Sequence, residues 1–153
     1  MSRNHKHRHS DHWQTPPDFY KSLNDEFNFD FDPCPLFAQF DGLTIDWGER
    51  NFVNPPYSKL EKQAFVEKAI TESKKGKLCV MLLPVSTSSQ LFHHYIKTNA
   101  TEIRFIEGRL HFLGFTQFFG EHELVPNAKE ARAMHDSMIV VFDGRKNGNQ
   151  GIS

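Results

Sequence analysis

The sequence has little cysteine and no long hydrophobic segment. Its 153 residues include only two cysteines, Cys34 and Cys79, and no Cys-x-x-Cys spacing. This argues against a structural zinc site or a disulfide framework, so we expect two buried thiols and no bound metal. No apolar run is long enough to cross a bilayer, and the polar N-terminus lacks the pattern of a signal peptide. We therefore expect a soluble, cytoplasmic protein with no membrane partner, as a monomer or weak dimer.

The sequence also has almost no net charge. The formal value is −1, which argues against tight, purely electrostatic binding of nucleic acid but does not exclude a local basic groove. With 38% hydrophobic residues and 15 phenylalanines, the chain can bury a core, and we expect one domain over residues 13–146. Residues 1–12 are basic and rich in histidine, and are expected to be a disordered arm rather than a metal-binding tract. Residues 147–153 are expected to be a flexible tail.

Apolar periodicity predicts alternating helices and strands. Helices are expected from 16–17 onward, over 59–75 and around 89–97. Strands are expected at 27–31, from 52, and at 78–83, 102–106, 110–113 and 138–142. This alternation predicts an α/β fold with a compact, mostly parallel central sheet and a C-terminal antiparallel strand. Residues 36–49 are expected to be irregular, and 114–136 to form a long loop that is a functional candidate.

The motif Asn54-Pro55-Pro56-Tyr57 is the most constrained part of the sequence. A residue before proline is held extended, and the two prolines stiffen the turn that presents their carbonyl groups. Asn54 adds an amide oxygen as acceptor, and Tyr57 adds an aromatic face. Two acceptors beside a stacking surface suit a planar group with an exocyclic NH₂, such as adenine. The alternative is a rigid strand-to-helix turn with an incidental tyrosine.

Two further proline-rich turns lie where ligands bind in open α/β sheets, at the carboxyl ends of strands or nearby. They are Thr15-Pro16-Pro17 and the segment Asp32–Pro35. Asp32 is a candidate acceptor for an ammonium or ribose group of a cationic cofactor. Its alternative role is to cap the turn before Pro33.

Several of these motifs together resemble the phage N6-adenine DNA methyltransferase (Dam-like) family. The matching segments are Trp13–Pro17, Phe31–Pro35, Asp46-Trp47, Phe52–Ser58, Gly108–Phe112 and Ser137–Phe142. The resemblance covers residues 13–143. It implies a Rossmann-like methyltransferase fold, S-adenosylmethionine as methyl donor, adenine N6 in DNA as acceptor, and protection of phage DNA from restriction in the cytoplasm of the bacterial host.

The resemblance also implies roles for individual residues. The catalytic residues would be Asn54, Pro55, Pro56 and Tyr57. The cofactor-binding residues would be Trp13, Thr15, Pro16, Asp32, Pro33 and Asp46. The chain departs from larger methyltransferases in three ways: it has no glycine-rich turn, it has only about eighteen residues between Pro35 and Asn54, and it has no separate target-recognition domain.

A base inside a duplex hides its amino group, so methylation in DNA would require the adenine to flip out of the stack. Tyr57 would then stack on the base, with Phe112 or Phe115 on its other face. Candidate DNA contacts are Lys59, Lys62, Arg104, Arg109, Arg132 and the segment 114–136, although each charge taken singly is typical of an ordinary solvated surface. Methylation of RNA adenine, methylation of a protein glutamine amide and a non-catalytic DNA-binding role remain alternatives.

Overall fold

A four-stranded mixed sheet forms the centre of the protein. The computed structural model describes residues 13–117, 124–132 and 136–145. Its central strands are β1 (Arg50–Val53), β2 (Leu78–Pro84), β3 (Glu102–Phe105) and β6 (Ser137–Asp143), in the spatial order β1-β2-β6-β3. β1 and β2 are parallel, whereas β6 is antiparallel to both β2 and β3. The predicted α/β class is correct, but the sheet is mixed, because the C-terminal strand inserts between two strands that share one direction.

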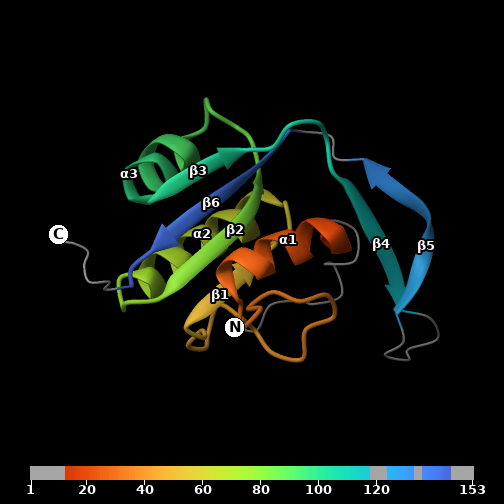
Figure 1. The fold of residues 1–153 in the computed structure, drawn as a ribbon, viewed down its shortest axis with the longest axis horizontal. Coiled ribbons are helices and arrows are strands. Elements are labelled where there is room, and N and C mark those ends of the chain that lie inside the picture. The colour runs from red at the N-terminus through yellow and green to blue at the C-terminus, as the bar shows by residue number, and fades with distance from the viewer. Residues whose placement is uncertain (1–12, 118–123, 133–135, 146–153) are drawn as a thin grey trace.

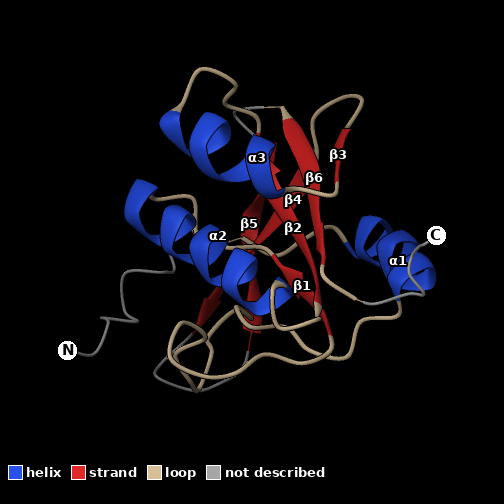
Figure 2. Ribbon diagram, turned by 90° about the vertical axis from the view of Figure 1, so that its left-hand side faces the viewer, coloured by secondary structure: helices blue, strands red, loops and turns tan. Residues whose placement is uncertain are grey.

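Helices cover both faces of this sheet (Figures 1 and 2). Helix α1 (Pro17–Phe27) lies on one face, and α2 (Lys59–Ser73) lies on the other with the π-helical turn η2 (Phe92–Ile96) and α3 (Lys97–Asn99). Neighbouring residues of β2 therefore point to opposite layers. Leu82 belongs to the same buried cluster as Leu23 of α1, and Leu83 to the same cluster as Phe65 of α2. A strand covered on both faces explains the continuous apolar run that predicted β2.

Local chemistry sets the ends of α1. Pro17 occupies its first turn, where a missing N–H costs nothing. The helix ends at Asn28, whose left-handed backbone (φ 56°) lets its N–H donate to the carbonyl of Asn24. The Asn24 side chain then accepts a hydrogen bond from the N–H of Phe29. This cap uses residues that were expected to begin a strand. From 27–31 only Phe31 pairs with the sheet, through an isolated parallel bridge to Asn51.

The segment expected to be a long loop contains a β-hairpin. Strands β4 (His111–Gln117) and β5 (Leu124–Arg132) pair in antiparallel fashion and project beyond the main sheet (Figure 1). Their register shifts between Leu113 and Phe115, at Gly114, and Pro126 lies in β5. Glycine and proline inside strands obscure the alternating pattern that signals a strand, which is why the loop prediction was wrong.

The remaining elements are close to the prediction. Residues 36–49 contain turns and bends, and α2 lies within the expected range. The expected helix at 89–97 is largely the π-helical η2 followed by the short α3. The N-terminal arm at 1–12 and the tail at 147–153 lie outside the described residues. Within the described chain, no helix is long and apolar enough to span a membrane.

Candidate active site

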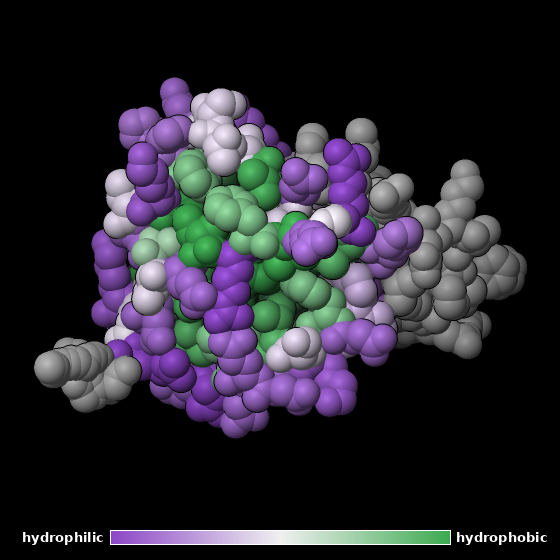
Figure 3. Space-filling model, turned by 45° about the horizontal axis from the view of Figure 1, so that its top comes forward, coloured by the Kyte–Doolittle hydropathy of each residue, from purple (hydrophilic) through white to green (hydrophobic). Residues whose placement is uncertain are grey.

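Two cavities lie at the carboxyl ends of β1 and β2, on either side of the turn Asn54–Tyr57. The Asp32 cavity, of about 420 Å³, is lined by Trp13, Gln14, Thr15, Pro17, Tyr20, Asp32, Cys34, Pro35, Leu36, Phe52 and Asn54. The Tyr57 cavity, of about 380 Å³, is lined by Tyr57, Lys59, Lys62, Gln63, Leu83, Pro84, Ser86, Ser89, Gln90, Leu91, Phe92, Ile96 and Met138. Both volumes fall within the range of small-molecule sites. With the top of the molecule turned forward, hydrophobic residues gather near the middle of the visible face, surrounded by hydrophilic ones (Figure 3).

Asn54 links the N-terminal segment to the end of β1. Its side-chain Nδ2 donates to the carbonyl of Trp13 at 2.8 Å and to the hydroxyl Oγ1 of Thr15 at 3.1 Å. The side chain is almost fully buried. These two hydrogen bonds fix the orientation of the amide, so that Nδ2 faces the N-terminal segment and Oδ1 lies on the other arm of the group. The structure thus brings Asn54 together with Trp13 and Thr15, which lie 41 and 39 residues earlier in the sequence.

Asp32 both caps its turn and lines the cavity. Its Oδ1 accepts a hydrogen bond from the N–H of Cys34 at 2.9 Å, which is the turn-capping role. Asp32 is exposed to solvent at the open cavity, although protein atoms crowd the space around its carboxyl group. This desolvation raises the pKa of the carboxyl to about 6, against the lowering effect of the Cys34 hydrogen bond. A carboxylate that is costly to leave unpaired suits a cationic ligand.

Tyr20 and Cys34 are lining residues that the sequence analysis did not assign to the site. Tyr20 belongs to α1 and packs against the buried cluster there, with its ring edge-on to Phe52 and the centroids 5.1 Å apart. Burial and the nearby charge of Asp32 raise the pKa of its hydroxyl. Cys34 is buried, as expected of a small thiol. The sequence could have indicated both residues as site residues, because Tyr20 lies close to Thr15–Pro17 and Cys34 lies close to Asp32.

The turn after Asn54 directs Tyr57 toward the second cavity. Pro55 and Pro56 are buried, so the turn is fixed within the protein rather than exposed at its surface. The hydroxyl of Tyr57 is buried and has no hydrogen-bond partner among the described residues. Burial also raises its pKa. The Tyr57 ring meets the ring of Phe112 edge-on, with centroids 6.3 Å apart. Phe112 therefore contacts the tyrosine that it was expected to face across a bound base.

The rim of the Tyr57 cavity carries positive charge and hydroxyl groups. Lys59 and Lys62 come from the first turns of α2, and Ser86 and Ser89 follow β2. Burial and the neighbouring charge of Lys59 lower the pKa of Lys62. The far wall includes Phe92, at the start of the π-helical η2, and π-helical turns are frequent at functional sites. The serines and threonine at 86–89, which follow an apolar run, are the feature of the sequence that could have indicated this wall.

Other predicted residues lie near the cavities or away from them. Pro16 precedes α1 and Pro33 is buried behind Asp32, and neither lines a cavity. Arg109 forms an ion pair with Asp136 at 3.6 Å, outside both cavities. Arg132 lies at the end of β5, paired in register with His111.

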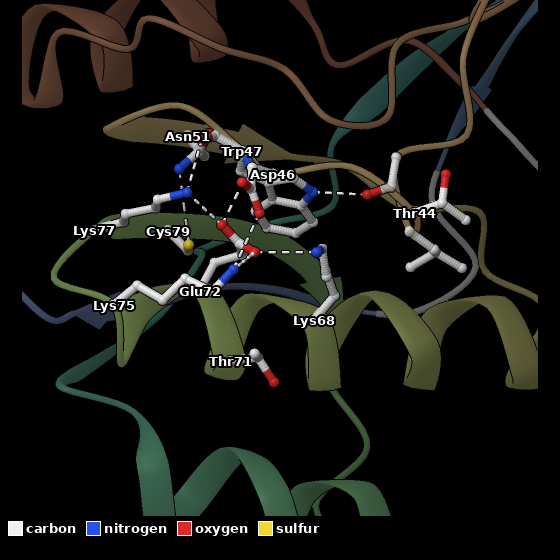
Figure 4. Close-up of polar contacts among 12 residues, drawn as sticks. Thr44, Asp46, Trp47, Asn51, Lys68, Thr71, Glu72, Lys75, Lys77 and Cys79 are labelled. Atoms are coloured by element: carbon white, nitrogen blue, oxygen red, sulfur yellow. Dashed lines mark hydrogen bonds and ion pairs between the residues drawn. The ribbon is translucent and has the colours of Figure 1, made fainter.

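Asp46 lies at the opposite end of the strands. It precedes β1, and its exposed carboxylate pairs with Lys75 at 3.1 Å. Figure 4 shows it beside the buried carboxylate of Glu72, which also contacts Lys68, Lys75 and Lys77. The structure therefore does not bring Asp46 to the Asp32 cavity.

Arg104, another candidate DNA contact, is held by two carboxylates. Its guanidinium pairs with Glu102 at 2.7 Å and with both carboxylate oxygens of Glu26. These hydrogen bonds raise its pKa further above its usual range. Arg104 thus ties α1 to β3.

The sequence profile of the DNA N-6-adenine-methyltransferase (Dam) family matches residues 2–150. The chain belongs to this methyltransferase family. No curated protein matches it significantly. Among solved structures, the tRNA (m1A58) methyltransferase TrmI from Aquifex aeolicus is similar at 14% identity and a TM-score of 0.33, over 87% of this chain and 52% of that one. The chain thus spans about half the length of that structure.

Proposed function

We propose that this protein transfers a methyl group from S-adenosylmethionine to N6 of an adenine in DNA, after that adenine has been flipped out of the duplex. The proposal rests on one observation: Asn54 lines one cavity and Tyr57, three residues later, lines the other. A donor in the first cavity and an acceptor base at the second would meet at the rigid turn between them. Membership of the family supports the same chemistry.

The Asp32 cavity fits the methyl donor. The donor is a cation with an ammonium, a ribose and an adenine, and, when bound, it supplies an electrophilic methyl group. Asp32 offers the anionic partner, and the aromatic residues Trp13 and Tyr20 offer π faces that attract cations. Thr15, whose Oγ1 lies 3.1 Å from Nδ2 of the Asn54 amide, connects this wall of the cavity to the reacting corner, the turn formed by Asn54–Tyr57. We assign Trp13, Thr15, Asp32 and Asn54 to this side, with Pro16 and Pro33 shaping its turns.

The Tyr57 cavity fits the extruded base. Tyr57 and Phe92 supply aromatic surface, and Leu83 and Met138 supply apolar walls. Unstacking a base costs roughly a few kcal/mol, and stacking on an aromatic side chain returns about 1–3 kcal/mol. Tyr57 therefore offsets much of the cost of extrusion. Phe112 would shift from its edge-on contact with Tyr57 to admit the base.

Asn54 and Pro55 would activate the amino group. The N6 lone pair of adenine is delocalised into the ring and is a poor nucleophile. If Asn54 Oδ1 and the Pro55 carbonyl oxygen each accept a hydrogen bond from one of the two N6–H groups, the nitrogen becomes more tetrahedral and its lone pair becomes more available. In-line attack by this nitrogen would form the N–CH₃ bond as the donor's S–CH₃ bond breaks, and one N6 proton would be released to solvent. Most of the rate enhancement would come from positioning.

DNA would be held partly by cations around the site. Lys59 lines the Tyr57 cavity, and Arg109 and Arg132 belong to the segment that leads into and ends the hairpin. We propose these three as phosphate contacts. Each phosphate contact steepens the salt dependence of DNA binding by about one unit in the log–log slope. Titrating binding with salt for single Lys59→Gln, Arg109→Gln and Arg132→Gln variants measures their contribution, and an unchanged slope removes that residue from the set.

The test of the function is methyl transfer with labelled S-adenosylmethionine. Plasmid DNA lacking N6-methyladenine, total RNA and a protein mixture are incubated separately with the enzyme, and the products are digested and analysed. We expect labelled N6-methyladenine from DNA. Label in RNA adenine or in a glutamine amide would favour those acceptors instead. DNA binding with no transfer to any acceptor would indicate a non-catalytic DNA-binding protein.

A further inference from the structure

Leu60 is a large hydrophobic residue that projects into solvent. It is 83% exposed, and Phe105, at 63%, is the other exposed large hydrophobic residue in the described part of the chain. Leu60 lies in the first turn of α2, six residues after Asn54. A single exposed leucine on a surface needs no special explanation. Its setting is what points to a ligand.

The first turn of α2 is fixed to the reacting corner. The helix begins directly after Tyr57 and Ser58, and the N–H of Lys62 donates to the carbonyl of Ser58 at 2.9 Å. Lys59 and Lys62 both line the Tyr57 cavity, so the helix side next to Leu60 forms a wall of that cavity. Leu60 itself is not among the lining residues. It stands beside the cavity, pointing outward, on a rigid element.

The first turn of α2 around Leu60 carries the cations Lys59 and Lys62 and one acid, Glu61, so its net charge is positive and favours a polyanion. Neither Lys59 nor Lys62 forms an ion pair within the described residues, unlike Lys75 and Lys77, which contact Glu72. The repulsion between these two lysines contributes to lowering the pKa of Lys62. A phosphate backbone passing over the cavity would relieve this repulsion. An exposed leucine would then face the base stack rather than water.

We propose that Leu60 is a wedge that enters the duplex at the target base pair and fills the space that the extruded adenine leaves. This inference rests on the proposed function, because it needs a duplex substrate and an extruded base. Proteins that distort DNA commonly insert leucine and similar apolar side chains between base steps. The wedge stabilises the opened duplex because it replaces the lost stacking contacts and because its apolar side chain becomes buried. It contributes nothing when the adenine is already unstacked, as in single-stranded DNA.

The experiment compares native and heat-denatured plasmid DNA lacking N6-methyladenine. Methyl transfer from labelled S-adenosylmethionine is measured for wild type, Leu60→Ala, Leu60→Phe and the control Phe105→Ala, which removes the other exposed hydrophobic residue at the far edge of the sheet. We expect Leu60→Ala to lower the rate on native DNA by about tenfold or more, since each tenfold corresponds to about 1.4 kcal/mol. On denatured DNA its rate should stay within about twofold of wild type. Leu60→Phe should restore most of the duplex activity, and Phe105→Ala should match wild type on both.

Thermal melting of each variant checks folding, which an exposed side chain should not disturb. Equal rates for Leu60→Ala and wild type on native DNA would overturn the wedge. So would an equal loss on native and denatured DNA, since that pattern indicates a structural effect on the site. Failure of the proposed function gives a different result, in which wild type transfers no methyl to either DNA.

Discussion

The carboxylate of Glu72 accepts a hydrogen bond from the backbone N–H of Trp47 at 3.2 Å, across 25 residues of sequence. Glu72 has no exposed surface, and it also contacts the ammonium groups of Lys68, Lys75 and Lys77 (Figure 4). Lys77 donates in turn to the carbonyl of Trp47 at 2.8 Å. Hydrogen bonds with the end of α2 and with the residue before β2 thereby hold the irregular segment that precedes β1 in place.

The same segment also contacts the turn that lines the Asp32 cavity. The indole Nε1 of Trp47 donates to the carbonyl of Gly42 at 2.7 Å. Gly42 in turn packs so tightly on Pro33 that a Cβ added there would lie 2.0 Å from the Pro33 carbonyl oxygen. Pro33 directly follows Asp32. A buried charge cluster at one end of the strands therefore helps to position a cavity-lining turn at the other end.

We predict that Glu72 makes the protein sensitive to acid. Burial disfavours its ionised form, but hydrogen bonds from Lys75, Lys77, Lys68 and the Trp47 N–H outweigh this and lower its pKa to about 2. Because the folded-state pKa is below the ordinary value, the stabilisation is present above about pH 5 and is lost as the pH falls toward 2. The loss should be at most about 3 kcal/mol, at 1.36 kcal/mol per pKa unit. Urea unfolding between pH 3 and 7 measures it.

Glu72→Gln should flatten that pH dependence and lower the free energy of unfolding at pH 7. The matched control is Glu67→Gln on the same helix, where the carboxylate is exposed and, among the described residues, accepts a hydrogen bond from Gln63 alone. The control should keep the wild-type profile. An identical acid profile in Glu72→Gln and wild type would show that other carboxyl groups cause the sensitivity.

We predict that donor binding depends on the ionisation of Asp32. The carboxyl has a pKa of about 6 in the free protein, and a cation in the cavity would stabilise its charged form and lower that pKa. The complex then holds fewer protons than the free protein, so affinity rises with pH through about 6 and levels off above it. Below the free pKa the affinity should fall by up to about tenfold per pH unit. Calorimetry with S-adenosylmethionine from pH 5 to 7 measures this.

Asp32→Asn should bind the donor more weakly at pH 7 and show little change with pH. Asp18→Asn, at an exposed position in the first turn of α1, is the control and should behave as wild type. A pH dependence that persists unchanged in Asp32→Asn would assign the titration to another group.

The parts of the fold that were predictable from the sequence are those where local and tertiary preferences agree. β2 and β6 are continuous apolar runs because helices cover β2 on both sides. Helix α2 begins soon after the proline-rich turn ends, because no proline follows to prevent it. The hairpin β4–β5 was not predictable, because Gly114 and Pro126 interrupt its pattern. The alternation at 27–31 was misleading for a physical reason: Asn28 caps a helix there.

The candidate site was only partly readable for similar reasons. Rare residue types in fixed order marked Asn54 and Asp32, which the structure places on one cavity. Tyr20 was hidden because a lining aromatic looks like a core aromatic on the same helix face. Asp46 lies away from this cavity, because sequence proximity to β1 does not say at which end of the strand a residue lies. Contacts such as Glu72 with Trp47 have no sequence signal at all.

Variants of Tyr57 distinguish the effect of its ring from the effect of its hydroxyl group. Its hydroxyl is buried without a partner among the described residues, so Tyr57→Phe removes a desolvated polar group and should leave the free energy of unfolding unchanged or raise it by about 1 kcal/mol. Methyl transfer to DNA should remain substantial, because the ring is retained. Tyr57→Ala should lose most of the activity together with the edge contact to Phe112. Equal activity losses in the two variants would mean that the hydroxyl is needed and that stacking is not the main effect.

Asn54 holds the N-terminal segment through two hydrogen bonds, and we also propose a catalytic role for it; two variants distinguish the two roles. Asn54→Ala removes the bonds to Trp13 and Thr15, which should cost about 1–2 kcal/mol of stability, and it removes the acceptor for N6. Methyl transfer should fall by about 10²–10³-fold or more, as for other groups that stabilise a transition state. Asn54→Asp keeps two acceptor oxygens but loses the donor, so the N-terminal segment should loosen and donor affinity should fall. Single-turnover rates at saturating donor separate these effects: wild-type turnover in Asn54→Ala would remove Asn54 from the reaction, whatever happens to donor binding.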